Sequence, residues 1–313
     1  MILSYTATEK DNGRTVYSIM RKELEISATL LRRIKKAGAI YVSGEPVFTN
    51  YKLTPGQRLT VDIGLAEQEC DNQPEEGDVE VLFENEGLLA VNKQSGVLIH
   101  PSRSRYTGTL SNFVAGYLQE RGAVQDMTSS HSLQPSCHAV NRLDRDTSGV
   151  VLFAKNSYMK ALASEALSQQ DALKEYNALV YGKMPEKGTV DAPICRLEEQ
   201  NMLRVISPEG QRAVTHYETI RIIPVGELHF SLIKLVLETG RTHQIRVHCL
   251  HIGHPILGDK LYSSPMSLSL SERLGVVTQA LHARRLSFTE PLSGKYTEIT
   301  APLPQVFKTV LEG

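Results

Sequence analysis

The stretch 141–149 (NRLDRDTSG) gathers side chains that could carry acid–base or nucleophilic chemistry, and it runs directly into the apolar segment 150–154. At its centre Leu143 separates Arg142 from Asp144. In an extended chain successive side chains point to opposite sides, so Arg142 and Asp144 would share one side and Leu143 the other. Because Asp, Asn, Ser and Gly are also turn residues, the stretch predicts either a catalytic Asp144 or a solvated surface turn.

A second carboxylate at Asp146 offers a different chemistry. Alternation would place it on the same side as Asp144, with about 7 Å between the two Cα atoms. Paired carboxylates flank the scissile bond in most glycoside hydrolases, so a sugar-cleaving site is an alternative. It is the weaker one, because the chain contains no Trp to form an aromatic sugar platform.

Tyr176 is a third candidate, within residues 174–182, whose alternating pattern predicts a strand. The pattern puts Tyr176 on one face with Ala178 and Val180. A Tyr on such a face is a core residue more often than a catalytic one. Its role therefore depends on what that face of the strand meets.

Several histidines follow the strand predicted at residues 230–238, in the segment 241–253 that we expect to be helical. His248 and His251 are three residues apart and share one side of a helix, which is compatible with a pair of metal ligands. The segment has no paired cysteines and no acid before Asp259, and the cysteines of the chain fit no zinc spacing. We therefore expect no metal site, and instead structural hydrogen bonds or contacts to nucleic acid.

Residues 27–38 predict a short helix with one strongly basic face. Ser27 is a favourable N-cap and Gly38 a favourable C-terminal stop. Apolar side chains gather on one side of this helix, and basic side chains without any acid gather on the other: Arg32, Arg33, Lys35 and Lys36. Such a face is often only solvated, but without acids it is also a good surface for phosphates.

The composition is that of a globular chain of 313 residues, with 41% hydrophobic and 22% charged residues. No apolar run approaches the length of a membrane span, and the first residues lack a signal-peptide pattern. With four scattered cysteines, these features predict reduced thiols and a cytoplasmic location. The formal net charge of −1 hides a strong asymmetry along the chain.

This asymmetry separates a basic head from an acidic connector. Residues 14–63 contain nine Lys or Arg against four Asp or Glu, whereas residues 67–86 contain nine acids and no base. We therefore expect a small domain at residues 1–66 and a larger one at 79–313. Between them, residues 67–78 lack periodicity and would act as an acidic linker, a tether without a shared core.

The basic head resembles the small RNA-binding domain named after ribosomal protein S-four, also called the alpha-L motif. The resemblance rests on residues 31–35 (LRRIK), 40–47 (IYVSGEPV) and 53–57 (LTPGQ). It implies that the helix and the following hairpin grip structured RNA. The RNA-binding side chains would be Arg32, Arg33, Lys35 and Lys36.

Three segments of the larger domain resemble the RluA-type RNA pseudouridine synthases. They are residues 142–149 (RLDRDTSG), 175–182 (EYNALVYG) and 238–248 (ETGRTHQIRVH). Shorter matches fit the same pattern at residues 92–93, 100–101 and 281–283. A basic RNA-binding head before the catalytic domain is usual in this family.

The resemblance implies the reaction and the roles of the site residues. Uridine in RNA would become pseudouridine: the N1–C1′ bond breaks, the uracil turns, and C5 is joined to C1′, with no cofactor. Asp144 would be the catalytic carboxylate, which either attacks the sugar or removes the 2′ proton. Arg246 would pair with Asp144 and favour its ionised form, and Tyr176 would stack beside the base. Arg142 would fill the space left by the flipped uridine, and Ile245 would be an apolar wall for the uracil.

The resemblance also implies an α+β fold, a mixed and mainly antiparallel sheet with flanking helices and a cleft across its middle. RNA would be the partner, ribosomal RNA rather than tRNA by the habit of the family, and we expect a monomer. The chain departs from the family pattern with Asn141 in place of His and Gln94 in place of Pro. Asn141 leaves open a second class of function, an inactive clamp that binds RNA without modifying it. A tRNA-directed synthase is a further alternative.

Overall fold

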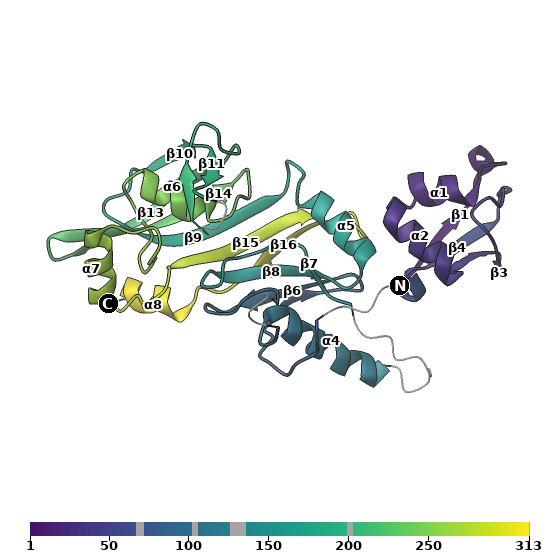
Figure 1. Ribbon diagram of the computed structural model, residues 1–313, viewed down its shortest axis with the longest axis horizontal. Helices are drawn as coiled ribbons and strands as arrows, with labels where there is room; N and C mark the ends of the chain where they lie inside the picture. The colour runs from purple at the N-terminus through teal and green to yellow at the C-terminus, as the bar shows by residue number, and fades with distance from the viewer. Residues whose placement is uncertain (67–71, 102–105, 126–135, 199–202, 313) are drawn as a thin grey trace.

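A long mixed sheet with helices on both faces forms the larger part of the molecule (Figure 1). The computed structural model describes residues 1–66, 72–101, 106–125, 136–198 and 203–312. From one edge to the other, the strands of the main path are β10 (Lys187–Asp191), β13 (Val214–Val225), β14 (Leu228–Leu237), β9 (Leu173–Tyr181), β15 (Leu281–Thr289), β8 (Ser148–Ala154), β6 (Leu88–Lys93) and β5 (Val81–Glu84). Two more strands pair beside this path, β7 (His138–Ala139) with β8 and β16 (Tyr296–Thr300) with β15.

The strand directions confirm the expected mixed, mainly antiparallel α+β fold. Among the described residues, all neighbouring strands of this sheet are antiparallel except β8 and β15, which are parallel. The strands predicted at residues 174–182 and 230–238 are present as β9 and β14, and the apolar segment 150–154 lies in β8. Their order along the sheet is what brings the candidate residues together.

One half of the sheet, β6 and β8, is covered on both faces. Successive residues of a strand point to opposite faces, so Ala90 belongs to the cluster under α5 (Ser157–Ala166) and Val91 to the cluster under α4 (Leu110–Gln125). Residues 88–91 of β6 and 150–154 of β8 are uninterrupted apolar runs, which is typical of strands that are buried on both faces.

The other half of the sheet is covered in the same way. On β9, Ala178 lies in the cluster with α6 (Gln244–His251). Its neighbour Leu179 lies in the cluster with α7 (Pro265–Arg273) and α8 (Gln305–Glu312). The sheet thus has two halves, each with its own helices, and β15 runs between them.

The two halves meet where β8 runs beside β15, and this junction is narrow. Its register consists of His282 opposite Ser148 and Ala283 opposite Gly149. Gly149 has a φ of 110°, and a Cβ there would lie 2.2 Å from the carbonyl oxygen of Ala283. Only glycine fits such a close approach in this conformation. The junction therefore fixes the start of β8, and with it the polar loop 141–147 that precedes the strand.

The N-terminal residues form a separate small unit. Its sheet has the strand order β1 (Ile2–Thr6), β4 (Arg58–Asp62), β2 (Ile40–Val42) and β3 (Glu45–Pro46). The helical segments of the unit are η1 (Glu9–Asp11), α1 (Val16–Lys22), α2 (Ala28–Ala37) and α3 (Ile63–Ala66). Helix α2 confirms the helix predicted at residues 27–38. The Ser27 hydroxyl accepts a hydrogen bond from the backbone N–H of Leu30, and Gly38 ends the helix with a φ of 66°.

The N-terminal unit contacts helix α5 of the larger unit. Arg33 donates a hydrogen bond of 3.1 Å to the Ser157 hydroxyl, and the Tyr158 hydroxyl donates one of 3.0 Å to the carbonyl oxygen of Leu24. One cluster of buried apolar side chains includes residues of both units. The head is thus held against α5, whereas a tether without shared core contacts was expected.

The described part of the predicted connector is also bound to the larger unit. Residues 72–78 form no helix or strand, as expected. The Asn112 amide donates to the carbonyl oxygen of Gln73 at 2.8 Å, and the backbone N–H of Gly108 donates to Glu75 at 2.7 Å. Residues 67–71 lie outside the described residues.

Two local features differ from the expectation or add to it. The helix predicted at residues 241–253 begins only at Gln244, because His243 has φ 58° and ψ 17°, outside the helical region. The short strands β11 (Ile194–Arg196) and β12 (Arg204–Ile206) form an additional hairpin near α6. Within the part of the chain that the structure describes, no helix is long and apolar enough to cross a membrane.

Candidate active site

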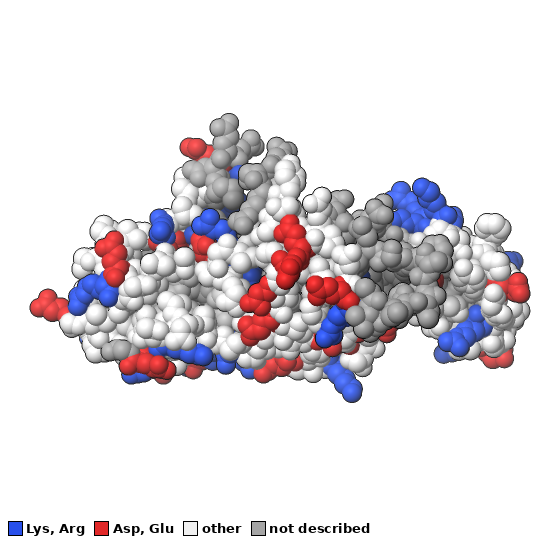
Figure 2. Space-filling view, turned by 90° about the horizontal axis from the view of Figure 1, so that it is seen from below, with Lys and Arg blue, Asp and Glu red and all other residues white. Residues whose placement is uncertain are grey.

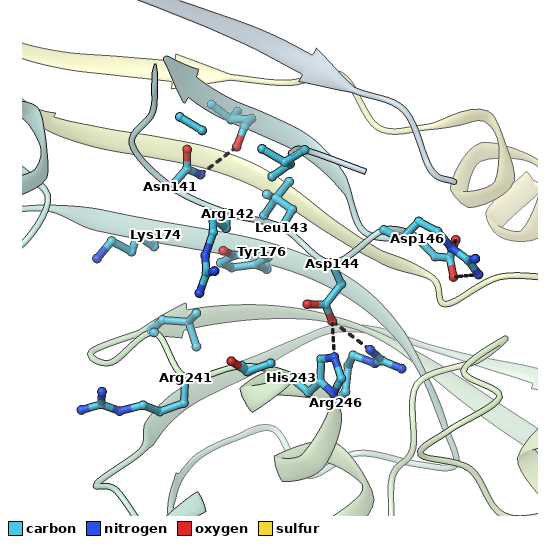
Figure 3. A pocket seen from close by; sticks show the side chains of 18 of the residues that line it. Asn141, Arg142, Leu143, Asp144, Asp146, Lys174, Tyr176, Arg241, His243 and Arg246 are labelled. Atoms are coloured by element: carbon cyan, nitrogen blue, oxygen red, sulfur yellow. Dashed lines mark hydrogen bonds and ion pairs between the residues drawn. The ribbon is translucent and has the colours of Figure 1, made fainter. Parts of the chain in front are cut away.

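The loop 141–147 brings Asp144 into a cavity of about 1340 Å³ over the middle of the sheet. Leu143 packs against the apolar cluster under α4. Arg142 and Asp144 line the cavity (Figure 3). The predicted alternation is therefore confirmed in part: Leu143 packs on the core while it also borders the cavity, and Asp146 does not share the side of Asp144. The cavity is large enough to hold a nucleotide, since sites for small molecules commonly have several hundred Å³.

Lys93, at the end of β6, holds the loop 141–147 in place through hydrogen bonds. The residue is only 1% exposed, and its Nζ donates to the carbonyl oxygens of Gln94, Val97 and Arg145 at 2.9, 2.7 and 2.6 Å. An ammonium group has three protons, so each proton has an acceptor. Burial lowers the pKa of Lys93 to about 8. Through the Arg145 carbonyl, this cation fixes the backbone directly after Asp144.

Asn141, where the family has His, fastens the other end of the loop to β8. Its amide nitrogen donates to the carbonyl oxygen of Val150 at 3.1 Å, and its amide oxygen accepts from the N–H of Leu152 at 2.7 Å. Both polar ends of the side chain are therefore bound to the strand backbone. This departure from the family pattern is compatible with an ordered loop.

Arg246 faces Asp144 from helix α6 and forms the expected ion pair. Its Nη1 lies 2.9 Å from Oδ2 of Asp144 (Figure 3). The opposite edge of the guanidinium binds Asp259 through two contacts, Nε to Oδ2 at 2.6 Å and Nη2 to Oδ1 at 2.9 Å. The planar fork of Arg suits such a two-point contact with a carboxylate. Asp259 thus fixes the direction in which Arg246 points at Asp144.

Because Arg246 and Asp259 are buried, the stability of this network depends on each charge having an opposite partner. Arg246 is 5% exposed and Asp259 is 1% exposed. Burial alone lowers the pKa of Arg246, but the bonds to Asp259 and Asp144 outweigh it and raise that pKa overall. Removing one partner of a buried ion pair leaves an uncompensated charge, which costs about 3–5 kcal/mol.

Tyr176 lines the same cavity from β9, whereas Ile245 does not line it. Removal from solvent and the nearby Asp144 charge raise the pKa of Tyr176 to about 12, so the phenol stays protonated at neutral pH. Ile245 is 4% exposed and belongs to the core cluster against which Tyr176 packs. Adjacent helix residues differ in direction by about 100°. Because Arg246 faces the cavity, its neighbour Ile245 points into the core, and the expected apolar wall for the base is not placed there.

Positive charge dominates the remaining cavity wall. Among the described residues, two acidic side chains line it, Asp144 and Asp146. The basic residues that line it are more numerous: Arg142, Arg145, Lys160, Lys174, Arg204, Arg241, Arg246, Lys260 and Arg285. Such an excess suits a polyanionic ligand.

Comparison with known proteins agrees with this arrangement. The family model for RNA pseudouridylate synthase matches residues 87–251. An uncharacterized RNA pseudouridine synthase of Bacillus subtilis, YhcT, is 34% identical over 310 residues, which cover 98% of this chain and 96% of that protein. The chain belongs to the RNA pseudouridylate synthase family.

Two further comparisons show how much of this synthase resembles known proteins. The ribosomal large subunit pseudouridine synthase D of Zymomonas mobilis is 38% identical over 263 residues, 82% of this chain and 78% of that protein. The solved structure of human RNA pseudouridylate synthase domain containing 4 superposes with a TM-score of 0.57 at 26% identity. The superposition covers 74% of this chain and 92% of the human one.

The synthase carries the predicted basic helix on its N-terminal unit, at one end of the molecule. Figure 2 shows a dense group of Lys and Arg side chains over this unit, at the right of the view. Arg32, Lys35 and Lys36 of α2 are exposed. Arg33 is half-buried and donates to Ser157 of α5, so its side chain is turned toward the larger unit rather than outward.

Two other chemistries, a carboxylate pair for sugar cleavage and a histidine metal site, find little support among the described residues of this synthase. Arg145 binds both oxygens of Asp146, at 3.0 and 3.1 Å, and this carboxylate points away from Asp144 (Figure 3). His248 uses its two ring nitrogens on Thr215 and on the carbonyl oxygen of Ala192. Among the described residues, no group of three or more His, Cys, Asp or Glu is placed to hold a metal ion.

Sequence reasoning missed Lys93 and Asp259 as parts of the site. A signal for Lys93 existed, because residues 92–93 match the family pattern. The turn that follows, however, has an ordinary composition. Asp259 gave no local signal, since its contact with Arg246 exists only in the tertiary structure.

Proposed function

We propose that this pseudouridine synthase modifies structured RNA of the large ribosomal subunit, with Asp144 as the anionic group beside the target ribose. The observation that carries the proposal is the carboxylate of Asp144, held by Arg246 at 2.9 Å inside a strongly basic cavity. Relatives named ribosomal large subunit pseudouridine synthase D support the choice of RNA.

The reaction requires no donor of electrons or groups, because uridine and pseudouridine are isomers. The N1–C1′ bond breaks, the uracil turns, and a C5–C1′ bond forms. The proton on C5 then leaves, and N1 gains a proton. The protein must supply an anionic oxygen near the ribose, hold the freed base, and move one proton.

Asp144 and Arg246 supply the first of these needs. The guanidinium pairs with the carboxylate through Oδ2, which leaves Oδ1 for the ribose. This oxygen either attacks the sugar carbon or accepts the 2′ proton. Tyr176, protonated at neutral pH, lies beside the base and relays the proton: its hydroxyl oxygen accepts the C5 proton while its own proton passes toward N1.

Arg142 fills the space that the target uridine leaves when it turns out of the RNA stack. Its side chain is exposed at the cavity, and it makes no hydrogen bond or ion pair with another described residue. Enzymes that act on a base must extract it from the stack, and a planar cation can take its place. The other cavity cations hold the flanking phosphates.

The N-terminal unit, residues 1–66, grips structured RNA next to the site, and residues 67–78 connect it to the catalytic domain at 79–313. Arg32, Lys35 and Lys36 of α2 make the phosphate contacts, and Arg33 sets the position of the helix on α5. Lys160, on the same helix α5, lines the cavity. A path of positive charge thus extends from the head to the site. We propose that the synthase acts as a monomer.

Mapping pseudouridines in the cell tests the choice of substrate. Ribosomal RNA and tRNA from a strain lacking the gene are compared by mass spectrometry with those of the parent strain. We expect loss of pseudouridine from large-subunit rRNA and restoration by the wild-type gene, but not by the Asp144→Asn gene. Loss confined to tRNA would instead support the tRNA-directed alternative. No loss in either RNA would support the inactive clamp.

A further inference from the structure

His243 lies between the catalytic carboxylate and a buried tyrosine. Its Nδ1 is 2.9 Å from the hydroxyl of Tyr262, and its Nε2 is 3.8 Å from Oδ2 of Asp144 (Figure 3). The side chain of His243 is 10% exposed. One ring nitrogen is therefore bound to the protein, and the other faces the cavity.

The hydroxyl of Tyr262 determines which ring nitrogen carries the proton. The backbone N–H of Arg204, which can only donate, gives a hydrogen bond of 2.8 Å to this hydroxyl oxygen. The hydroxyl proton is then available for Nδ1 of His243, which accepts it. The other tautomer would aim the lone pair of Nε2 at the negative carboxylate of Asp144. The geometry thus favours the tautomer with hydrogen on Nε2.

The surroundings keep this imidazole neutral. Burial lowers the pKa of His243 below its ordinary value. The charged groups that face it are the carboxylates of Asp144 and Asp259 and the guanidinium groups of Arg246 and Arg204, so opposite charges oppose each other. At neutral pH the group facing Asp144 is therefore a neutral N–H donor.

One cationic donor and one neutral donor point to the same carboxylate oxygen of Asp144. Nη1 of Arg246 and Nε2 of His243 lie nearest to Oδ2, and among the described residues no donor binds Oδ1. The 3.8 Å separation is too long for a hydrogen bond. Catalytic contacts are commonly long without substrate and shorten in the complex.

The backbone of His243 is held in an unusual conformation for this purpose. Its φ of 58° and ψ of 17° lie in the left-handed region, which residues other than Gly seldom occupy. The residue precedes α6, yet its side chain does not cap the helix. The conformation instead directs the ring between Tyr262 and Asp144.

We propose that His243 is a positioning residue for Asp144. Its Nε2–H holds Oδ2, so that Oδ1 faces the ribose, and Tyr262 acts through His243 by fixing the tautomer. The inference rests on the proposed role of Asp144.

Two substitutions at residue 243 test the donor. The probe is a large-subunit rRNA transcript with tritium at C5 of uridine, and the readouts are the single-turnover rate of tritium release and the RNA affinity. We expect His243→Ala to lower the rate about 10- to 100-fold, because a small misplacement of a reacting group costs this much. His243→Gln retains an N–H donor and should recover a rate within about fivefold of wild type. Affinity should stay the same in both variants.

A second pair of variants tests the path from Tyr262. Tyr262→Phe keeps the ring over the Arg246 guanidinium, where the two lie 4.9 Å apart, and removes only the hydroxyl. We expect it to lower the rate about fivefold in the wild type, but by less than about twofold in the His243→Gln background, since residues that act as one unit are not additive. Equal effects in both backgrounds would overturn the role of Tyr262.

Asp144→Asn, measured beside these variants, separates the two levels of the proposal. If Asp144→Asn retains activity, the proposed function is wrong and the inference falls with it. If Asp144→Asn is inactive while His243→Ala keeps the wild-type rate, only the inference is overturned. A His243→Ala defect that His243→Gln fails to recover also contradicts it, because the donor would then be irrelevant. Thermal unfolding of each variant confirms that the fold is intact.

Discussion

Basic side chains serve this synthase in two opposite ways, in the cavity and on helix α2. Arg246 is buried in the cavity, where Asp144 and Asp259 occupy its whole guanidinium. Arg32, Lys35 and Lys36 of α2 are exposed, and none of these makes an ion pair with another described residue. Arg246 therefore has a fixed geometry and a paired charge, whereas the three side chains of α2 have unpaired charges and no fixed geometry.

The difference separates two requirements of an RNA-modifying enzyme. A reaction on one atom requires a side chain that is fixed within fractions of an ångström. Attraction of RNA requires charge near phosphates, and it weakens as salt is added. Substitutions that keep charge but change shape should therefore damage the cavity only. Substitutions that remove charge far from the cavity should affect binding only.

The largest effect should come from Asp144→Asn. The amide has nearly the shape of the carboxylate and can still meet Arg246, but it is neither a strong nucleophile nor a base. We expect tritium release to fall at least about a hundredfold, which corresponds to about 2.7 kcal/mol, with nearly unchanged RNA affinity. Turnover above a few per cent of wild type would remove Asp144 from the mechanism.

Arg246→Lys should have the next largest effect. Lys keeps the charge but has no planar fork, so one ammonium cannot reproduce the contacts to both Asp144 and Asp259. We expect the single-turnover rate to fall about 30-fold or more, equivalent to about 2 kcal/mol. The matched control is Arg241→Lys, an exposed residue that lines the same cavity and should change the rate less than threefold. Similar losses in both variants would show that charge alone matters in the cavity.

Removing the exposed charge of α2 should affect binding and leave the chemistry intact. For the triple change Arg32→Gln, Lys35→Gln and Lys36→Gln, we expect affinity for large structured RNA to fall about tenfold at low salt. The slope of log affinity against log salt should decrease by about 2 to 3, because three phosphate contacts are lost. At saturating RNA the single-turnover rate should stay within about twofold.

A control with the same change in net charge shows whether position matters. Lys187, Lys295 and Lys308 are exposed on other parts of the molecule. Their combined replacement by Gln should leave the salt slope nearly unchanged. If it lowers the slope as much as the α2 variant does, α2 is only a solvated face.

The effect of Lys93 should appear in stability, and neither in the reaction rate nor in RNA affinity. It is a buried cation without a carboxylate, with a pKa lowered from 10.5 to about 8. Between these pH values the unfolded chain binds more protons than the folded one, so the free energy of unfolding rises with pH. Relative to Lys93→Met, we expect the wild type to gain about 1–3 kcal/mol in urea unfolding from about pH 8 to pH 10. Parallel curves would mean that burial does not disfavour the charged amine.

Local patterns predicted the elements and part of the site. The caps at Ser27 and Gly38 define α2, and alternation defines β9. Alternation also predicted Asp144 at the cavity and Leu143 against the core, although Leu143 borders the cavity as well and Asp146 turns away from Asp144. These features depend on neighbours in the sequence, which explains why they could be predicted.

Contacts between distant segments could not be predicted from the sequence. Ile245 was expected beside the base because it stands next to Arg246 in the family motif, but the helix turns it into the core. Lys93 and Asp259 contribute through partners 52 and 13 residues away. The expected tether was also wrong in one respect, since apolar contacts and the Tyr158–Leu24 hydrogen bond join the head to α5.

The narrow junction between β8 and β15 has a consequence for protein engineering. Asp144 comes from one half of the sheet, and Tyr176 and Arg246 come from the other. The junction therefore determines how these residues are positioned relative to one another. The loop 141–147 is therefore not a cassette that can be grafted onto another scaffold by itself. A transplant would also have to carry Gly149 and the Ala283 carbonyl that it meets. In directed evolution, residue 149 should tolerate no larger side chain, although it lies inside the sheet and not in the catalytic loop.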